Sequence, residues 1–171
     1  AGLMKFGRPI RFLFSDGKLD EAVYRELIGF RGQSLIVGTT VGLWVELLPI
    51  LRSRRAKFLG QPSIIHGGGW KKLQELNISA NTFKESFLRH GDIRTINFYG
   101  MTEQLGAVSY ECEFGNLHLP SCNRVLIRDP VEGFSLPFGS VGLIQQLSLL
   151  PRSYPGVSIL TDDLGTIVDG S

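Results

Sequence analysis

Apolar and polar residues follow different patterns in the two halves of the chain. In the first half, short apolar runs typical of strands alternate with segments whose apolar residues recur every three or four positions, as on a buried helix face. The expected strands are residues 10–14, 34–37, 63–66 and 95–99. The expected helices are a segment with Leu19, Val23 and Leu27, residues 41–52, residues 70–75, and a segment with Phe83 and Phe87. This alternation predicts crossover connections and a mainly parallel sheet with flanking helices.

Three local signals indicate where these helices begin and end. Pro49 lies inside the second helix and is expected to kink it or to end it early. Ser79 or Asn81 is the expected N-cap of the fourth helix, because short polar side chains accept hydrogen bonds from the first helical N–H groups. Gly91 follows the fourth helix and suits its C-terminal stop.

The second half of the chain contains short strands separated by glycine and proline. The expected strands are residues 108–112, 124–128, 141–149, 157–160 and 166–168. Such closely spaced strands predict an antiparallel sheet or a small barrel. The fold class is therefore α/β, with an α/β part over residues 1–105 and a β-rich, barrel-like subdomain over residues 106–171.

Composition limits the function classes. Of the 171 residues, 43% are hydrophobic and 20% are charged, which is enough apolar material for a buried core. The net charge of +2 and the single short basic run at residues 52–55 do not predict a nucleic-acid surface. No apolar stretch reaches the roughly 18 residues of a membrane span. Two cysteines do not make a disulfide framework, so we expect a reducing, cytoplasmic setting.

The run Asn97-Phe98-Tyr99-Gly100-Met101-Thr102-Glu103 follows the fourth expected strand. Ligands of open α/β sheets bind at the carboxyl ends of strands. A hydroxyl such as that of Thr102 can hydrogen-bond a phosphate oxygen, and a carboxylate such as that of Glu103 is a hard ligand for Mg²⁺. The alternative interpretation is an ordinary strand-to-loop turn with a surface glutamate.

This run resembles the YGxTE motif of the adenylate-forming superfamily, which includes acyl-CoA synthetases and luciferases. The resemblance implies that Thr102 contacts the α-phosphate of an acyl-adenylate and that Glu103 helps to hold Mg²⁺. It also implies that Tyr99 and Gly100 line the adenylate pocket. ATP and Mg²⁺ are then the expected cofactors.

A glycine-rich turn, Gly67, Gly68 and Gly69, follows the third expected strand and is continued by Trp-Lys-Lys. Glycines allow a ligand to approach the backbone closely, whereas a tight strand-to-helix turn needs only one or two of them. The superfamily has such a turn about 30 residues before YGxTE, where it packs against adenine. The form GGGWKK is similar to the LuxE-type acyl-protein synthetases. Lys71 and Lys72 are expected to face solvent.

A third stretch, Leu160-Thr161-Asp162-Asp163-Leu164-Gly165, resembles the TGDLG motif, whose aspartate accepts hydrogen bonds from the ribose hydroxyls. That role corresponds to Asp163. This sequence has Asp162 where the motif has glycine, which favours the LuxE-type branch and leaves the local geometry open. The alternative is an Asp-rich turn between two strands.

The resemblance extends over roughly residues 30–170 and implies an enzyme that activates a carboxylic acid, in LuxE-type proteins a fatty acid, as acyl-AMP. The acyl group then passes to a thiol of a protein or of CoA, and other subunits of a fatty-acid reductase complex are expected partners. A phenylacetate-type acyl-CoA ligase and a degenerate nucleotide-binding module without activity are the alternatives.

The phosphate loop, the catalytic lysine and the acceptor cysteine of the family have no counterpart here. Gly38-Thr39-Thr40 imitates the phosphate loop but lacks its lysine and lies about 60 residues before YGMTE. We therefore expect that both ends of the chain are cuts within a larger protein and that the chain alone turns over little or no substrate.

Cys112, His118 and Cys122 form a C-x5-H-x3-C pattern in a loop-rich stretch. Zinc binds such ligands in tetrahedral sites, but structural sites take four of them. Two ordinary core cysteines and a surface histidine are the favoured interpretation, and a zinc site is the alternative.

Overall fold

The computed structural model describes residues 10–70, 78–152 and 155–168. The chain divides into two compact units, Ala1–Ile96 and Asn97–Ser171. The division between these units falls at Ile96, before the expected boundary at residue 105. Within the described ranges, no helix has the length and apolar character needed to cross a lipid bilayer.

The first unit opens with a small hairpin. Strands β1 (Phe14–Ser15) and β2 (Lys18–Leu19) pair antiparallel around Asp16 and Gly17, which have positive φ angles of 50° and 71°. The expected strand over residues 10–14 is therefore wrong except at its last residue, because the turn shortens it to this hairpin. Helix α1 (Glu21–Gly29) follows, and its N-cap Asp20 accepts hydrogen bonds from two backbone N–H groups.

Two parallel strands form the centre of this unit. β3 (Gln33–Thr39) and β4 (Gln61–Gly67) pair in parallel along their whole lengths, with Ile36 opposite Ile64. Both isoleucines are buried, with 8% and 0% of their surfaces exposed. The predicted strands at residues 34–37 and 63–66 and the parallel crossover between them are thus confirmed.

The crossover between β3 and β4 is helical from Thr40 to Ser53. It comprises α2 (Thr40–Gly42), a π-helical turn η2 (Leu43–Leu47) and α3 (Leu48–Ser53). Pro49 does not break this helix. The preceding π turn pairs the N–H of Leu48 with the carbonyl of Leu43, five residues back, and this wider turn accommodates a proline at the start of α3.

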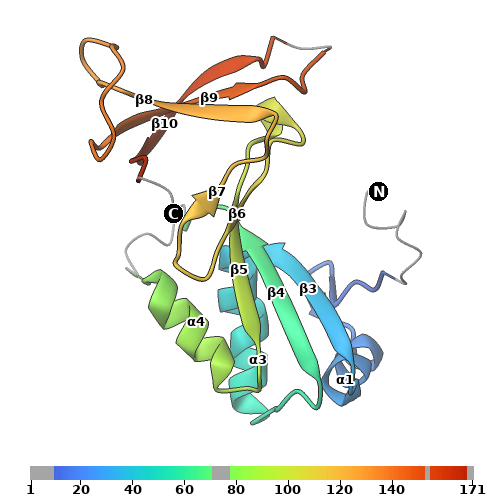
Figure 1. Cartoon of the computed structure of the whole chain (residues 1–171). Helices are drawn as coiled ribbons and strands as arrows, with labels where there is room; N and C mark the ends of the chain where they lie inside the picture. Colours follow the sequence, from blue (N-terminus) through green and yellow to red (C-terminus); the bar gives the residue numbers. More distant parts are fainter. Residues whose placement is uncertain (1–9, 71–77, 153–154, 169–171) are drawn as a thin grey trace. The chain divides into compact units, whose positions relative to one another are not determined.

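Helix α4 (Ala80–Leu88) begins at its N-cap Ser79, whose hydroxyl accepts a hydrogen bond from the Thr82 N–H. Ser79 rather than Asn81 is therefore the cap. The helix buries Phe83 and Phe87, which join residues of the crossover helix and of both strands in one core. That core contains Tyr24, Ile36, Leu43, Leu47, Leu48, Leu51, Phe58, Ile64, Phe83, Phe87 and Ile93. Figure 1 shows α3 and α4 beside the strands.

Strand β5 (Arg94–Tyr99) reaches across the boundary between the units and confirms the expected strand at residues 95–99. It pairs antiparallel with β6 (Ser109–Glu111), which pairs in turn with β7 (Leu117–His118). The resulting mixed sheet has the strand order β3-β4-β5-β6-β7. The first strand of the expected β-rich part therefore extends the α/β sheet instead of starting a separate one.

The remaining strands form a second sheet of order β10-β9-β8 (Figure 1). Its members β8 (Asn123–Arg128), β9 (Gly142–Ser148) and β10 (Ser158–Gly165) all pair antiparallel. The described residues thus form an antiparallel three-stranded sheet, which is the first of the two arrangements expected from the sequence, the other being a small barrel. β10 also corrects the expected turn after residue 160, because it continues through Thr161-Asp162-Asp163, and residues 166–168 form no strand.

Candidate functional site

The turn that follows β5 carries the hydroxyl and the carboxylate singled out in the sequence. Gly100 and Met101 lead into a 3₁₀ turn, η4 (Thr102–Gln104). Thr102 Oγ1 donates a hydrogen bond of 3.1 Å to Glu103 Oε2, and both side chains are exposed. The pair therefore exposes a hydroxyl and a carboxylate side by side. The carboxylate oxygens could bind a hydrated divalent cation, and the hydroxyl could hydrogen-bond a phosphate.

The end of β5 and the middle of β10 are joined by a side-chain hydrogen bond. The Tyr99 hydroxyl donates a bond of 2.7 Å to Asp163 Oδ2 across 64 residues of sequence. Burial, followed by this bond to Asp163, raises the pKa of Tyr99 to about 12. The phenol is therefore neutral at physiological pH and remains a donor to the carboxylate. Both residues belong to the second unit, and the structure brings together these two predicted site residues.

A bulge in β10 places Asp163 outside the strand ladder. Leu160 pairs with Gln145 and Leu164 with Leu143, so the register between β9 and β10 shifts over the intervening residues. The Thr161 hydroxyl fixes this bulge because it donates to the Ile144 carbonyl at 3.0 Å and accepts from the Asp163 N–H at 3.2 Å.

Asp162, which stands where the resembling motif has glycine, shows no strained backbone. Asp16 and Arg55 are the non-glycine residues with positive φ in the described part of the chain, and Asp162 is not among them. A glycine is therefore not required at this position, and the departure from the motif has a simple structural explanation.

Gly156 brings the loop before β10 against the backbone of the 3₁₀ turn. A Cβ atom on Gly156 would lie 2.5 Å from the carbonyl oxygen of Glu103, closer than real side chains approach. The sequence singled out neither Gly156 nor the buried Gln104 as a site residue. Gln104 lies in a polar stretch and Gly156 follows a proline, and neither setting predicts the contacts that these residues make.

The glycine-rich turn lies in the first unit, whereas Tyr99, Thr102 and Asp163 lie in the second. Gly67 ends β4 and is buried, while Gly68 and Gly69 are exposed. Gly68 has a φ of +82°, which favours glycine, and a Cβ on it or on Gly69 would meet no atom within 4 Å. A side chain at either position would therefore meet no neighbouring atom, and the assignment of this turn to a ligand stays a prediction. Lys71, Lys72 and all but the first residue of the expected helix at 70–75 lie outside the described residues.

The cysteine pattern does not form a metal site. Cys112 and Cys122 are free thiols, and both are half-buried. Within the described ranges, no three His, Cys, Asp or Glu side chains gather closely enough to hold a metal ion. Cys112, His118 and Cys122 are therefore not gathered around a common point in this structure.

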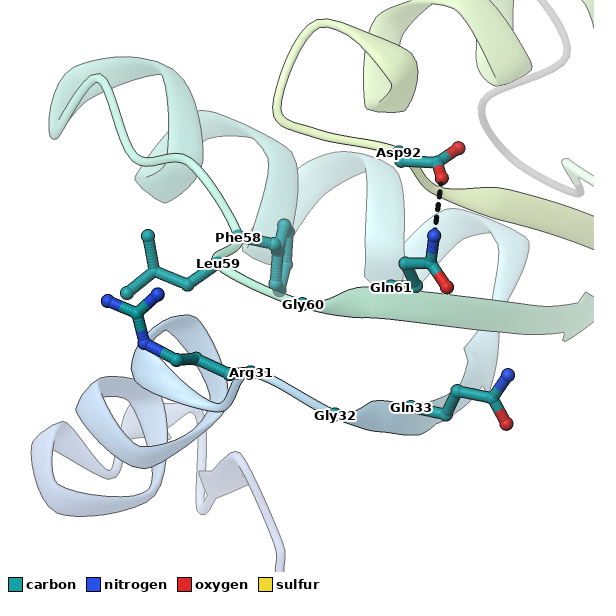
Figure 2. A pocket seen from close by; sticks show the side chains of 8 residues that line it. All are labelled: Arg31, Gly32, Gln33, Phe58, Leu59, Gly60, Gln61 and Asp92. Atoms are coloured by element: carbon teal, nitrogen blue, oxygen red, sulfur yellow. Dashed lines mark hydrogen bonds between the residues drawn. The ribbon is translucent and has the colours of Figure 1, made fainter.

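An open pocket of about 580 Å³ lies at the other end of the parallel strands (Figure 2). It is lined by Arg31, Gly32, Gln33, Phe58, Leu59, Gly60, Gln61 and Asp92. Gln33 and Gln61 are the first residues of β3 and β4, so this pocket faces the amino ends of the strands. Its polar wall includes a hydrogen bond of 3.0 Å from Gln61 Nε2 to Asp92 Oδ2. Ligands of open α/β sheets bind at the carboxyl ends instead.

Several solved structures share this arrangement of elements. The chain is similar to ATP-bound MatB from Rhodopseudomonas palustris (TM-score 0.56, 18% identity, 80% of this chain and 29% of that one). It is also similar to the amide bond synthetase McbA from Marinactinospora thermotolerans (TM-score 0.55, 18% identity, 78% and 29%). VinN gives a TM-score of 0.56 at 16% identity over 80% of this chain and 37% of its own. The chain therefore shares its fold with part of each of these proteins, and it spans about a third of their length.

The sequence pattern of the family described as acyl-protein synthetase, LuxE, matches residues 43–171. The chain belongs to this family, as the resemblance of its three motifs predicted. A comparison with curated proteins gave no match.

Proposed function

We propose that this chain supplies part of the adenylate site of an acyl-adenylating ligase. In that reaction, a carboxylate oxygen of the acid attacks the α-phosphorus of ATP, the bond to the β-phosphate oxygen breaks, and acyl-AMP and pyrophosphate result. The observation that carries the proposal is the 2.7 Å bond between Tyr99 and Asp163. It joins the strand that leads into YGMTE with the strand that carries the TDDLG stretch, so two motifs distant in sequence meet in space.

Asp163 is the residue proposed for the ribose. A carboxylate accepts hydrogen bonds from vicinal hydroxyls, and the bond from Tyr99 occupies one of its two oxygens and orients the other. The raised pKa of Tyr99 keeps its phenol protonated, so its role here is that of a donor and not of a base. Tyr99 and Gly100 would then line the nucleotide pocket.

Thr102 and Glu103 are the residues proposed for the phosphate and the metal. Their exposed oxygens, 3.1 Å apart, are the hard donors that suit Mg²⁺. Mg²⁺ held there would neutralise negative charge on the phosphate oxygens. On binding, the Thr102 hydroxyl would turn its proton from Glu103 Oε2 to the α-phosphate, which would leave the Glu103 carboxylate to hold the ion. The turn of Gly67, Gly68 and Gly69 is proposed to face adenine, on the strength of its resemblance to the glycine-rich turn of the family.

The acid is proposed to be a fatty acid and the acceptor a thiol, on the strength of the family to which the chain belongs. The thiol would belong to a protein or to CoA, and partner subunits would receive or deliver the acyl chain. Neither Cys112 nor Cys122 is proposed as the acceptor, because both lie within or beside the sheet strands and are half-buried.

The test is acid-dependent exchange of labelled pyrophosphate into ATP by the full-length protein, measured with a long-chain fatty acid and with an aryl acid. We expect exchange with the fatty acid and Mg²⁺, and its loss in Asp163→Ala. Exchange with the aryl acid alone would instead support the phenylacetate-type ligase. No exchange together with no binding of ATP·Mg²⁺ by calorimetry would refute the proposal and leave a nucleotide-binding relative without activity.

A further inference from the structure

Gln104 is the last residue of the 3₁₀ turn that carries Thr102 and Glu103, and it differs sharply from both. Thr102 and Glu103 are exposed, whereas Gln104 is 0% exposed. A buried amide is costly unless its groups are hydrogen-bonded, so its partners show what it does.

The side-chain nitrogen of Gln104 donates two hydrogen bonds to backbone carbonyls. One bond of 3.0 Å reaches Gln146 in β9, and one of 2.6 Å reaches Gly156 in the loop before β10. The backbone of the same residue completes the turn, because its N–H pairs with the Met101 carbonyl and its carbonyl accepts from the Ala107 N–H. Gln104 therefore ties the 3₁₀ turn to two segments that are about 40 and 50 residues away in sequence.

Gly156 contacts the 3₁₀ turn at two of its residues, Glu103 and Gln104. Its Cα lies so near the carbonyl oxygen of Glu103 that a side chain would not fit. Its own carbonyl accepts the shorter of the two bonds from Gln104. The residue that holds Gln104 thus also contacts the backbone of the neighbouring metal-ligand candidate, and the two contacts together fix the position of that backbone.

Packing alone does not explain an amide at this position. The side-chain oxygen of Gln104 is buried and has no hydrogen-bond partner in the described part of the chain. An unpaired buried acceptor destabilises the folded state, because it has lost its bonds to water and gained none in return. A methionine or leucine would fill nearly the same volume without that cost, but it could not donate to the two carbonyls. The two donors are therefore the reason for the amide.

We propose that Gln104 is a positioning residue that holds Thr102 and Glu103 at the geometry required for the phosphate and the metal. This inference rests on the proposed function, since it assigns the purpose of the turn. Gln104 touches no reacting atom and acts through the backbone of the turn. Displacements of about 1 Å at catalytic groups can reduce rates about 100-fold, so a rigid tether of this turn has a large effect on chemistry.

The test compares Gln104→Met with a matched control, Gln146→Met, in the full-length protein. The Gln146 side chain is also 0% exposed and also leaves its amide oxygen unpaired among the described residues. It donates one longer bond, 3.4 Å, to the Ala107 carbonyl, outside the 3₁₀ turn. Both substitutions remove a buried amide of equal size, and only the first releases the turn.

Three readouts separate positioning from stability. For Gln104→Met we expect a 10- to 100-fold fall in kcat for acid-dependent pyrophosphate exchange, an unchanged KM for the acid, and a raised Mg²⁺ concentration for half-maximal rate. Hydrogen exchange at the backbone amides of residues 102–107 should be faster. Gln146→Met should also lower the melting temperature, by no more than Gln104→Met does, and leave the Mg²⁺ dependence near that of the wild type.

The outcomes distinguish the two proposals. Wild-type protein without exchange activity refutes the proposed function, and the positioning role with it. An active wild type with equal Mg²⁺ dependence in Gln104→Met and Gln146→Met overturns the positioning role alone, as does unchanged hydrogen exchange of the turn. If Gln104→Met does not fold, Gln104→Asn, an amide one methylene too short to reach both carbonyls, gives the same readouts.

Discussion

The Tyr99 hydroxyl lies 2.7 Å from Asp163 Oδ2, and this single bond connects the strand before YGMTE with the bulge of β10. The two residues are half-buried and exposed respectively, so the bond is formed at the border between protein and solvent. Each partner can be altered without creating a buried unpaired charge. The pair is therefore suited to quantitative substitution experiments.

A double-mutant cycle on Tyr99→Phe and Asp163→Asn should reveal coupling of about 1 kcal/mol in the free energy of unfolding, because Tyr99→Phe removes the bond and Asp163→Asn removes the negative charge that strengthens it. Urea unfolding followed by far-UV circular dichroism measures it. Tyr110→Phe, on the neighbouring strand β6, serves as the control. Its coupling energy with Asp163→Asn should be less than about 0.5 kcal/mol. Additive effects of Tyr99→Phe and Asp163→Asn would show that the bond is not formed in solution.

Alkaline titration should identify Tyr99 as a late-titrating phenol. Its folded pKa of about 12 lies above the ordinary value of 10.0, so folding favours the neutral form. The stability that Tyr99 provides is therefore complete below about pH 10 and is lost as the pH rises toward 12. Absorbance of phenolate near 295 nm should show a step that is missing in Tyr99→Phe. If Tyr99→Phe instead loses an absorbance step near pH 10, the raised pKa does not belong to Tyr99.

Glu103→Ala in the full-length protein should abolish Mg²⁺-dependent adenylation, with a fall in pyrophosphate exchange of at least about 100-fold. The physical reason is the loss of the carboxylate proposed to hold the ion. Glu113→Ala removes an exposed glutamate from the loop between β6 and β7 and should leave the rate within about twofold of the wild type. Near-normal exchange by Glu103→Ala would remove Glu103 from the site.

Gly156→Ala should displace the 3₁₀ turn, because the new methyl group would lie 2.5 Å from the Glu103 carbonyl oxygen. We expect a loss of stability of about 1–3 kcal/mol and a lower kcat for exchange. Gly29→Ala is the matched control, since a Cβ there meets nothing within 4 Å and its φ is not positive. It should be neutral or slightly stabilising. Equal stability of the two variants, by thermal unfolding, would contradict the close approach.

Much of the α/β part could be predicted from the sequence because its signals are local. The strands near Ile36 and Ile64 and the helix with Phe83 and Phe87 have clear periodicity and sit where expected. Pro49 misled the prediction, since a local rule for α-helices does not foresee a π turn that makes room for the ring.

Errors in the second half arose where pairing overrides local preference. The Asp-rich stretch at Asp162 reads as a turn. Leu160 and Leu164 on either side of it pair with β9, however, and these pairs and the Thr161 hydroxyl keep the stretch within β10. The approach of Tyr99 to Asp163 followed from the motif resemblance alone, because no periodicity relates residues 64 positions apart. Gln104 gave no signal at all, since burial of a loop glutamine is decided by segments far away in the chain.

The bulge in β10 separates the residues of this strand that pair with β9 from the residues that carry the candidate site. Residues on either side of it pair with β9 and carry the sheet, whereas Thr161, Asp162 and Asp163 stand outside the regular register. Apart from Thr161, whose hydroxyl fixes the bulge, side chains on this short interval can therefore be exchanged without disturbing the pairing that maintains the fold. Related proteins could diversify their chemistry at this one point of the strand while the architecture around it stays constant.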